Sequence, residues 1–339
     1  MNNEATESET TPSETTDGLV VSFVIPALNE EKFIEQCLSS IDALNKPEQV
    51  SEIEIVVVDN ESTDRTVEIS AAHGAIVVSC PPGRPSLARN LGAKHARGDW
   101  LAFIDADCEP AKDWLGHCFR STQQQGVVAV GGRVLPPQHV KGWVARSAGV
   151  LFYPPGDGET RDATWLTTQG LMVSGRAFGV VGGFDETLTT CEDCELGYRL
   201  LKHGRLVHNP AAELVHHGES KTLHEVFARE AWRSTDNLRL ALSRPSDLRN
   251  WLSVLLPVLF SGLLLAGLVG LVVSVFTELS PWFGATSFLA GLALLPLMTW
   301  YKTRRSFKPR LFVGQLCVLA TYFLGRSVGL LGSFSRVER

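Results

Sequence analysis

The chain has 339 residues, of which 44% are hydrophobic, and a formal net charge of -6. This length and composition argue against a disordered protein and predict one large domain or two ordinary ones around a sizeable core. The acidic balance gives no sign of the clustered basic face of a nucleic-acid-binding protein, so we expect no nucleic acid among its partners. The seven cysteines are odd in number and scattered, which favours a reducing compartment over a disulfide framework.

The first 17 residues differ from everything that follows. They are rich in Ser, Thr and Glu and contain no basic residue. Such a segment has too little apolar surface to fold, and it lacks the basic start and apolar stretch of a secretory signal. We therefore expect a disordered acidic tail over residues 1–17 and the first strand directly after it.

Residues 18–240 show apolar runs of strand length that alternate with longer helical patterns. Residues 20–26 and 52–59 are typical of buried strands. Between them, residues 30–44 place Phe33, Ile34, Cys37, Leu38 and Ile41 on one helical face. This alternation predicts an α/β domain with helices packed on a sheet.

The composition changes after residue 249, and we assign residues 241–339 to a membrane region. Residues 251–276 and 282–301 contain no charged side chain, and each stretch is long enough to cross a hydrocarbon core of about 30 Å. We predict that both span the membrane. A third stretch, residues 311–332, contains Arg326, so crossing, a re-entrant path and an interfacial position all remain open for it.

Basic residues orient these stretches. Positive charge crowds the connection between the second and third stretches, whereas the connection between the first two has only Glu278. The basic residues are Lys302, Arg304, Arg305, Lys308 and Arg310. Because cytoplasmic loops hold the excess of Lys and Arg, we expect a multi-pass protein of the inner (cytoplasmic) membrane whose α/β domain faces the cytoplasm.

Two carboxylates follow an apolar run in the segment FIDADCE. Asp105 and Asp107 are two residues apart, so on an extended strand their side chains point the same way. Paired carboxylates of this kind suit Mg²⁺ or Mn²⁺ shared with substrate phosphates. An isolated Asp-x-Asp is more often a solvated acidic turn, so the metal interpretation depends on the motifs around it.

Those motifs occur in a fixed order over about residues 20–220 and resemble family 2 glycosyltransferases. VIPALNE (24–30), VVDNESTDRT (57–66) and the arginine-containing segment 83–100 resemble the family's nucleotide-binding elements. The resemblance implies a GT-A nucleotide-diphospho-sugar transferase fold with a mixed central sheet. It also implies eight donor-binding residues: Pro26, Asn29, Glu30, Asp59, Arg84, Arg89, Asp105 and Gly170.

The segment CEDCELGYRLLKHG (191–204) resembles the family's acidic motif. By this resemblance Asp193 is the general base, with Glu192 beside it as a second catalytic residue. An acceptor hydroxyl must lose a proton as it attacks the anomeric carbon, and a positioned carboxylate can take that proton. Carboxylates at a helix start are also favoured by the helix dipole alone.

The resemblance implies a metal-dependent enzyme that uses Mg²⁺ or Mn²⁺. Asp105 and Asp107 are the expected metal ligands, and His216 and Glu109 are further candidates. The Cys191 and Cys194 pair has the CxxC spacing, but neither a second CxxC nor a matching pair of histidines accompanies it, so we interpret it as incidental.

The resemblance implies an inverting hexosyltransferase that moves one sugar from a nucleotide-diphosphate donor, with a UDP-sugar favoured. The apolar stretches indicate a membrane-associated, polyprenyl-linked acceptor and membrane lipid as partners, in cell-surface polysaccharide or glycolipid synthesis. Residues 227–239 form a basic, amphipathic pattern that we expect at the membrane interface, and they do not match the QxxRW motif of processive synthases. A polyprenyl-phosphate sugar synthase and a non-catalytic nucleotide-sugar-binding scaffold are the alternatives.

Overall fold

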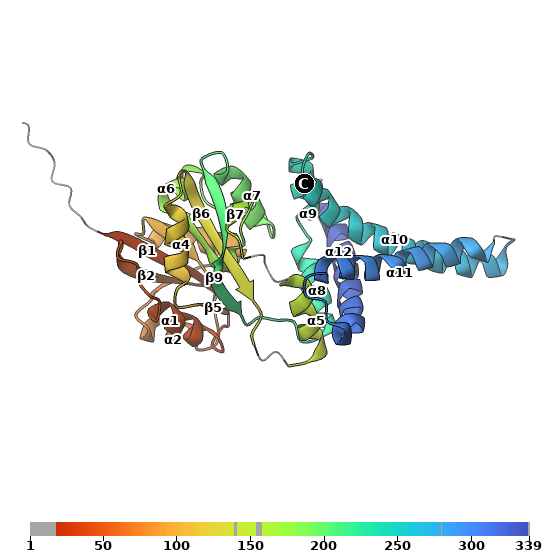
Figure 1. Cartoon of the computed structure of the whole chain (residues 1–339), viewed down its shortest axis with the longest axis horizontal. Helices are drawn as coiled ribbons and strands as arrows, with labels where there is room; N and C mark the ends of the chain where they lie inside the picture. Colours follow the sequence, from red (N-terminus) through yellow and green to blue (C-terminus); the bar gives the residue numbers. More distant parts are fainter. Residues whose placement is uncertain (1–17, 139–140, 154–157, 279, 338–339) are drawn as a thin grey trace, which may run out of the picture.

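The computed structural model describes every residue except 1–17, 139–140, 154–157, 279 and 338–339. The predicted acidic tail over residues 1–17 lies outside the described residues. An α/β body occupies one side of the molecule, and a long pair of antiparallel helices projects from the other side (Figure 1).

The body is built on one mixed sheet in the order β3-β2-β1-β4-β8-β6-β9-β5, with β7 paired to β9. The strands are β1 Leu19–Ala27, β2 Val50–Asp59, β3 Ile76–Ser79, β4 Trp100–Phe103, β5 Cys108–Pro110, β6 Val127–Leu135, β7 Arg161–Ala163, β8 Leu171–Ser174 and β9 Arg205–His216. Strands β3, β2, β1 and β4 are parallel to one another, whereas β8 runs antiparallel to both β4 and β6. The predicted α/β fold with a mixed sheet is confirmed.

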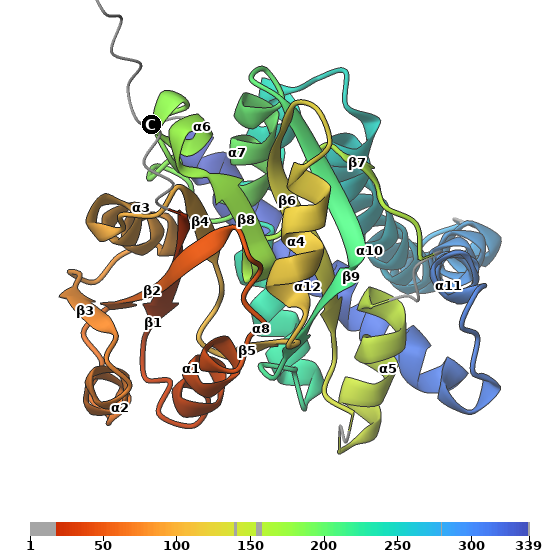
Figure 2. The same ribbon diagram turned by 60° about the vertical axis from the view of Figure 1, so that its left-hand side comes forward.

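Helices cover both faces of this sheet (Figure 2). The helices of the body are α1 Ile34–Asp42, α2 Thr66–Ala72, α3 Pro85–His95, α4 Trp114–Thr122, α6 Gly175–Val180 and α7 Glu192–Leu200. Helices α1 and α4 bury their apolar sides in one core cluster, and α3, α6 and α7 contribute to the cluster on the opposite face. The continuous apolar sequences of β1 and β2 follow from this burial on both faces.

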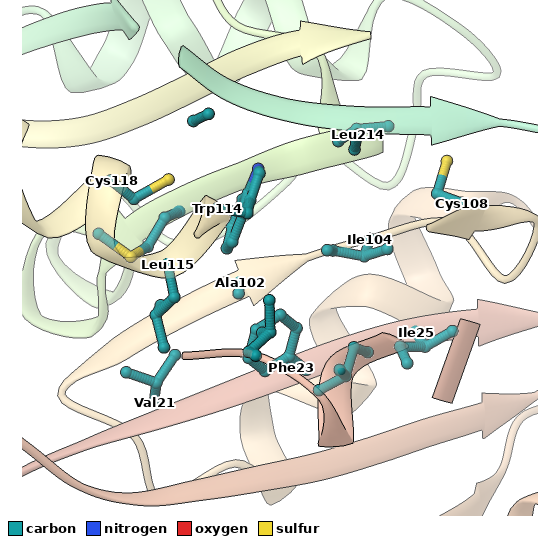
Figure 3. Close-up of a cluster of buried hydrophobic side chains, with 14 of the residues drawn as sticks. Val21, Phe23, Ile25, Ala102, Ile104, Cys108, Trp114, Leu115, Cys118 and Leu214 are labelled. Carbon is teal, nitrogen blue, oxygen red and sulfur yellow. The ribbon is translucent and has the colours of Figure 1, made fainter. Parts of the chain in front are cut away.

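The core beneath α4 fixes the position of the sheet centre (Figure 3). Trp114 is fully buried, and its ring centroid lies 6.0 Å from that of Phe23 on β1. Ala102 and Ile104, at the end of β4, belong to the same cluster. The two aspartates that follow Ile104 are therefore attached to a rigid edge, at the carboxyl ends of three neighbouring parallel strands where α/β sheets bind ligands.

Two long helices form the projecting hairpin. They are α10 Leu248–Phe276 and α11 Pro281–Thr303, which match the two predicted spans at 251–276 and 282–301. The hairpin closes over small residues, because a Cβ added at Gly284 would overlap the backbone of α10 at Leu271. The outward side chains along both helices are large and apolar. A third helix, over Pro309–Gly332, is also long and apolar enough to cross a membrane.

This third helix, α12 Phe312–Val337, lies crosswise between the hairpin and the body (Figure 1). It packs against α5 Trp143–Phe152 and α8 Leu223–Arg233 on one side and against α10 and α11 on the other. Arg326 of α12 forms an ion pair with Glu230 of α8, with 3.0 Å between Nε and Oε2. The arginine that made the third stretch ambiguous therefore faces protein.

The basic amphipathic segment over residues 227–239, which we expect at the membrane interface, is divided between two helices. Helix α8 ends at Arg233, and α9 Asn237–Ser243 begins after a turn. The carboxylate of Asp236 in this turn accepts hydrogen bonds from the N–H groups of Thr189 and Thr190, at 2.6 and 3.0 Å. These bonds join the turn to the loop before α7, and a continuous helix would lose them.

Candidate active site

A cavity of about 1500 Å³ opens at the carboxyl edge of the parallel strands. The end of β1, the aspartates after β4 and the start of α7 line its inner part. Its outer part is lined by residues of α8, α9, α10 and α12. A single cavity thus extends from the predicted nucleotide-binding edge to the helices that resemble membrane spans.

Arg89 links the two acidic motifs at the centre of this cavity. Its side chain is only 5% exposed, and it donates from Nη2 to Asp105 Oδ1 and from Nη1 to Glu192 Oε1, each at 2.8 Å. A buried guanidinium that donates one charge-assisted hydrogen bond to each of two carboxylates fixes the position of both, since its planar group holds the two donors at a fixed separation. The sequence predicts Arg89 as a donor ligand; both of its terminal nitrogens here bind protein carboxylates, and a donor contact stays a prediction.

Asp107 lies beside His216, with 3.3 Å between Oδ2 and Nε2. Burial raises the pKa of Asp107, but the hydrogen bond and charge of His216 outweigh burial and hold that pKa below its usual value. The other ring nitrogen of His216 lies 3.2 Å from Glu219 Oε1. Glu219 was not singled out from the sequence, although a carboxylate three residues after a candidate ligand histidine is a recognisable signal.

The carboxylates at this edge repel one another. Burial, and then the negative charges of Asp107 and Asp105, raise the pKa of Glu30 to about 7. Among the described residues no three His, Cys, Asp or Glu side chains gather closely enough to hold a metal by themselves. Mg²⁺ commonly takes one or two protein carboxylates and completes its shell with substrate phosphates and water. The crowded charge around Asp107 fits a cation of that kind.

Glu109, the further metal candidate, points elsewhere. Its Oε2 lies 3.0 Å from His217 Nε2 and accepts a hydrogen bond from Gln36 at 2.8 Å. The ring of His217 in turn stacks on Phe33 before α1. Glu109 therefore joins β5 to the α1 region in this structure, and a role as metal ligand stays a prediction.

Glu192 and Asp193 occupy the first turn of α7. The preceding Cys191 has a left-handed φ of 63°, so the chain turns sharply into the helix at the cavity wall. Burial, and next the neighbouring charge of Glu192, raise the pKa of Asp193 to about 7. A carboxylate with a pKa near neutrality is well matched to accepting a proton at physiological pH.

The remaining donor candidates shape the rim. Pro26 and Glu30 line the cavity directly. Asn29 has a left-handed φ of 57° and accepts a hydrogen bond from the Thr63 N–H at 2.8 Å, which joins the loops after β1 and β2. In the second loop the carboxylate of Asp59 accepts from the Ser62 N–H at 3.1 Å. Asn29 and Asp59 thus organise the loops after β1 and β2, and their contacts with a donor stay predictions.

Arg84 and Gly170 have structural partners as well. Arg84 donates from Nη1 to the carbonyl of Glu186 at 2.7 Å. Gly170 is buried, and an added Cβ would overlap the side chain of Leu214 in the core. Core packing is sufficient to explain the glycine, so its predicted contact with the donor sugar has no separate structural support and stays a prediction.

Comparisons with known proteins find glycosyltransferases. Residues 22–184 match the model of glycosyl transferase family 2. Glycosyltransferase AglE of Haloferax volcanii is 35% identical over 120 residues, which are 34% of this chain and 39% of the relative. The pre-mycofactocin glycosyltransferase of Mycobacterium tuberculosis is 28% identical over 238 residues, which are 66% of this chain and 48% of the relative. The chain thus spans less than half the length of these curated relatives.

A solved structure shows the same fold over nearly the whole chain. It is the mannosyltransferase PcManGT from Pyrobaculum calidifontis in complex with GDP-mannose and Mn²⁺, which aligns with a TM-score of 0.58 at 16% identity. The alignment covers 96% of this chain and 90% of that protein. Residues 22–184, which include most of the sheet and the two aspartates after β4, therefore belong to glycosyl transferase family 2, and the chain has a GT-A fold.

Proposed function

We propose that this protein transfers one sugar from a nucleotide-diphosphate donor, with inversion at the anomeric carbon, to an acceptor that is anchored in the membrane. The main support is the cavity itself, which places Asp105, Asp107 and Asp193 in one space and continues to α10 and α12. The nucleotide diphosphate binds beside Asp107, and a UDP-sugar is the favoured donor. The acceptor enters from the helical side.

The reaction that follows from this placement is a single displacement. Asp193 takes the proton of an acceptor hydroxyl as that oxygen attacks the anomeric carbon. The new carbon–oxygen bond forms on one face while the bond to the diphosphate breaks on the other, and the diphosphate leaves with the bonding electrons. Arg89 holds Glu192 and Asp105 in place, so that the base region and the donor region keep their separation. Hexose is the favoured sugar class.

A divalent cation fits the donor side of this scheme. Asp107 and Asp105 would hold Mg²⁺ or Mn²⁺, with His216 near Asp107. When bound, such an ion neutralises the charge that develops on the departing diphosphate.

The arrangement of the helices supports an inner-membrane protein with its catalytic domain, residues 18–240, in the cytoplasm. We propose that α10 and α11 cross the membrane and return, because their outward faces are apolar throughout. We place α12 along the membrane surface. It packs along α8, which contains Glu225, Arg229 and Arg233, and a crossing by α12 would pull these charges into hydrocarbon at a cost of about 2.5–3.5 kcal/mol for each arginine.

This topology has a direct test. A cysteine introduced near residue 337, in a background without the accessible native Cys191, Cys194 and Cys317, is labelled in inside-out vesicles by a membrane-impermeant maleimide if α12 lies on the cytoplasmic surface. Labelling in right-side-out vesicles instead would place the C-terminus outside and make α12 a third span.

The enzymatic alternative is a polyprenyl-phosphate sugar synthase. Its nucleophile is a phosphate oxygen that is already anionic, so it needs no base. We favour a hydroxyl acceptor because Asp193, with its raised pKa, lines the cavity as a carboxylate suited to proton transfer. Labelling of bare polyprenyl phosphate that survives Asp193→Asn would favour the synthase.

The central experiment measures free nucleotide diphosphate released by detergent-solubilised protein with a panel of nucleotide sugars, Mn²⁺ or Mg²⁺ and a membrane lipid extract. We expect turnover that requires both metal and lipid and that Asp193→Asn abolishes. Binding of donors without any turnover, in both the wild type and the variant, would favour a non-catalytic nucleotide-sugar-binding scaffold.

A further inference from the structure

The outer wall of the cavity contains positive charge that the reaction itself does not use. Arg233 of α8 and Arg326 of α12 both line this wall. Among the residues that the structure describes, they share one carboxylate partner, because Glu230 lies 3.4 Å from Arg233 Nη1 through Oε1 and 3.0 Å from Arg326 Nε through Oε2. Two guanidinium groups against one carboxylate leave a net positive charge beside the cavity.

A third cation, Lys302, lies close to Arg326. The Nζ of Lys302 lies 5.9 Å from the ring centroid of Tyr322, and the guanidinium of Arg326 lies 4.7 Å from the same centroid. No carboxylate within salt-bridge distance of Lys302 occurs among the described residues. Three cations around one carboxylate repel one another. In a partly dehydrated environment this repulsion costs free energy, and a bound anion would offset it.

Arg233, Arg326 and Lys302, here called the cationic cluster, lie between Asp193 and the long apolar helices. Burial, and next the charge of Asp193, raise the pKa of Cys191 to about 12, and the charge of Arg326 acts against that shift. Arg326 is thus within electrostatic reach of the start of α7, where Glu192 and Asp193 lie. On its other side α12 is part of the apolar cluster with Phe260 of α10.

We propose that Arg233 and Arg326 form a subsite for a phosphate or diphosphate group that joins the acceptor's sugar to its lipid chain. This inference rests on the proposed function and names the acceptor's chemistry. Guanidinium groups bind phosphate oxygens in bidentate fashion, and two of them with one shared carboxylate match a doubly charged group. The lipid chain then follows the apolar helices, and the sugar hydroxyl reaches Asp193.

The test compares two ligands with the same chain, farnesyl diphosphate and farnesol. Binding is measured by thermophoresis on full-length protein in phosphatidylcholine nanodiscs. EDTA is present, so that no metal can hold the diphosphate at the donor end. We expect the diphosphate to bind at least about tenfold more tightly than the alcohol, the difference typical of charge-assisted hydrogen bonds. Equal affinities would overturn the proposal.

Three variants assign the effect to the cluster. Arg233→Gln, at a 43% exposed side chain, should weaken diphosphate binding about tenfold and leave farnesol binding unchanged. Glu230→Gln removes the competing carboxylate and should tighten diphosphate binding, a result that a purely structural role would not produce. Arg304→Gln, on the basic connection outside the cavity, is the matched control and should bind as the wild type does.

The same phosphate chemistry occurs in bulk phospholipid headgroups. If farnesyl diphosphate binding is lost when a fifth of the nanodisc lipid is phosphatidylglycerol, the cluster is a general anionic-lipid site and the acceptor assignment is wrong. Because these readouts need no turnover, they separate this proposal from the reaction. Selective diphosphate binding in a protein that transfers no sugar would refute the proposed function alone.

Discussion

The sheet edge and the helical hairpin are stabilised in opposite ways. At the sheet edge, buried charges fix each other's positions, as when Arg89 bridges Asp105 and Glu192. In the hairpin the contacts are between apolar side chains and small residues, and large apolar groups face outward. Charged networks tolerate little change because each partner left alone is costly, whereas apolar packing spreads its free energy over many weak contacts. Chemistry and anchoring can therefore be disturbed separately.

The largest effect should come from the base. Asp193→Asn keeps the shape of the side chain but cannot take a proton, so we expect the rate of sugar transfer to fall by about 10² to 10⁴-fold. Donor affinity should be nearly unchanged. The measurement is nucleotide release together with donor binding, with Asp42→Asn on the exposed side of α1 as the matched control. Equal rates for Asp193→Asn and wild type would remove Asp193 from the mechanism.

The next effect tests the charged network. Arg89→Ala leaves Asp105 and Glu192 without their shared partner, and we expect a loss of about 3 kcal/mol of stability, seen as a fall in Tm of several degrees. The comparison is Arg65→Ala, which breaks an ion pair with Glu68 whose side chains are 67% and 65% exposed and should leave Tm unchanged. Similar shifts for the two variants would show that burial does not govern this network.

A hairpin variant should separate anchoring from chemistry. Gly284→Leu pushes α10 and α11 apart and should destabilise their packing by about 1–3 kcal/mol. We expect slow hydrolysis of the donor by water to continue, because the sheet edge is untouched, while transfer to lipid falls. Gly262→Leu, where an added side chain meets open space, is the control. Equal losses of hydrolysis and transfer would mean that the hairpin supports the catalytic domain itself.

The smallest effect is the dependence on pH. Burial and Glu192 raise the pKa of Asp193 to about 7, and only the deprotonated form accepts a proton, so the rate should fall as pH drops below 7. One pH unit below the pKa, about a tenth of the molecules remain active. Glu192→Gln removes the neighbouring negative charge and should move the inflection in the rate profile to lower pH. An unmoved inflection would assign the titration to another group.

Much of the catalytic body was predictable because its signals are local. The apolar runs of β1 and β2 and the Asp-x-Asp segment after β4 can be recognised within a few residues. The structure has both strands where the runs predict them, but the two aspartates follow β4 in a loop and turn and not on an extended strand. Contacts between distant segments were not predictable. Arg89 and Glu192 are 103 residues apart, and Arg326 and Glu230 are 96 apart, so no local periodicity indicates that they meet.

The same limit explains the break between α8 and α9. Residues 227–239 have helical periodicity throughout, but the turn at Asp236 depends on two N–H groups that come from the loop before α7. A local pattern gives the preference of a segment, and tertiary hydrogen bonds can override that preference. The two predicted spans agree with α10 and α11 because twenty or more apolar residues leave few other choices.

The length of α10 has a consequence for where the acceptor meets the enzyme. A helix of 29 residues is roughly 43 Å long at 1.5 Å per residue, about 13 Å more than a hydrocarbon core of about 30 Å. The surplus falls at the amino-terminal end, because Arg249, Asn250 and Ser253 line the cavity. On the proposed topology these first turns stand among the lipid headgroups. An acceptor would then need only to raise its polar end to headgroup depth, and its tail could remain among the surrounding lipids throughout the reaction.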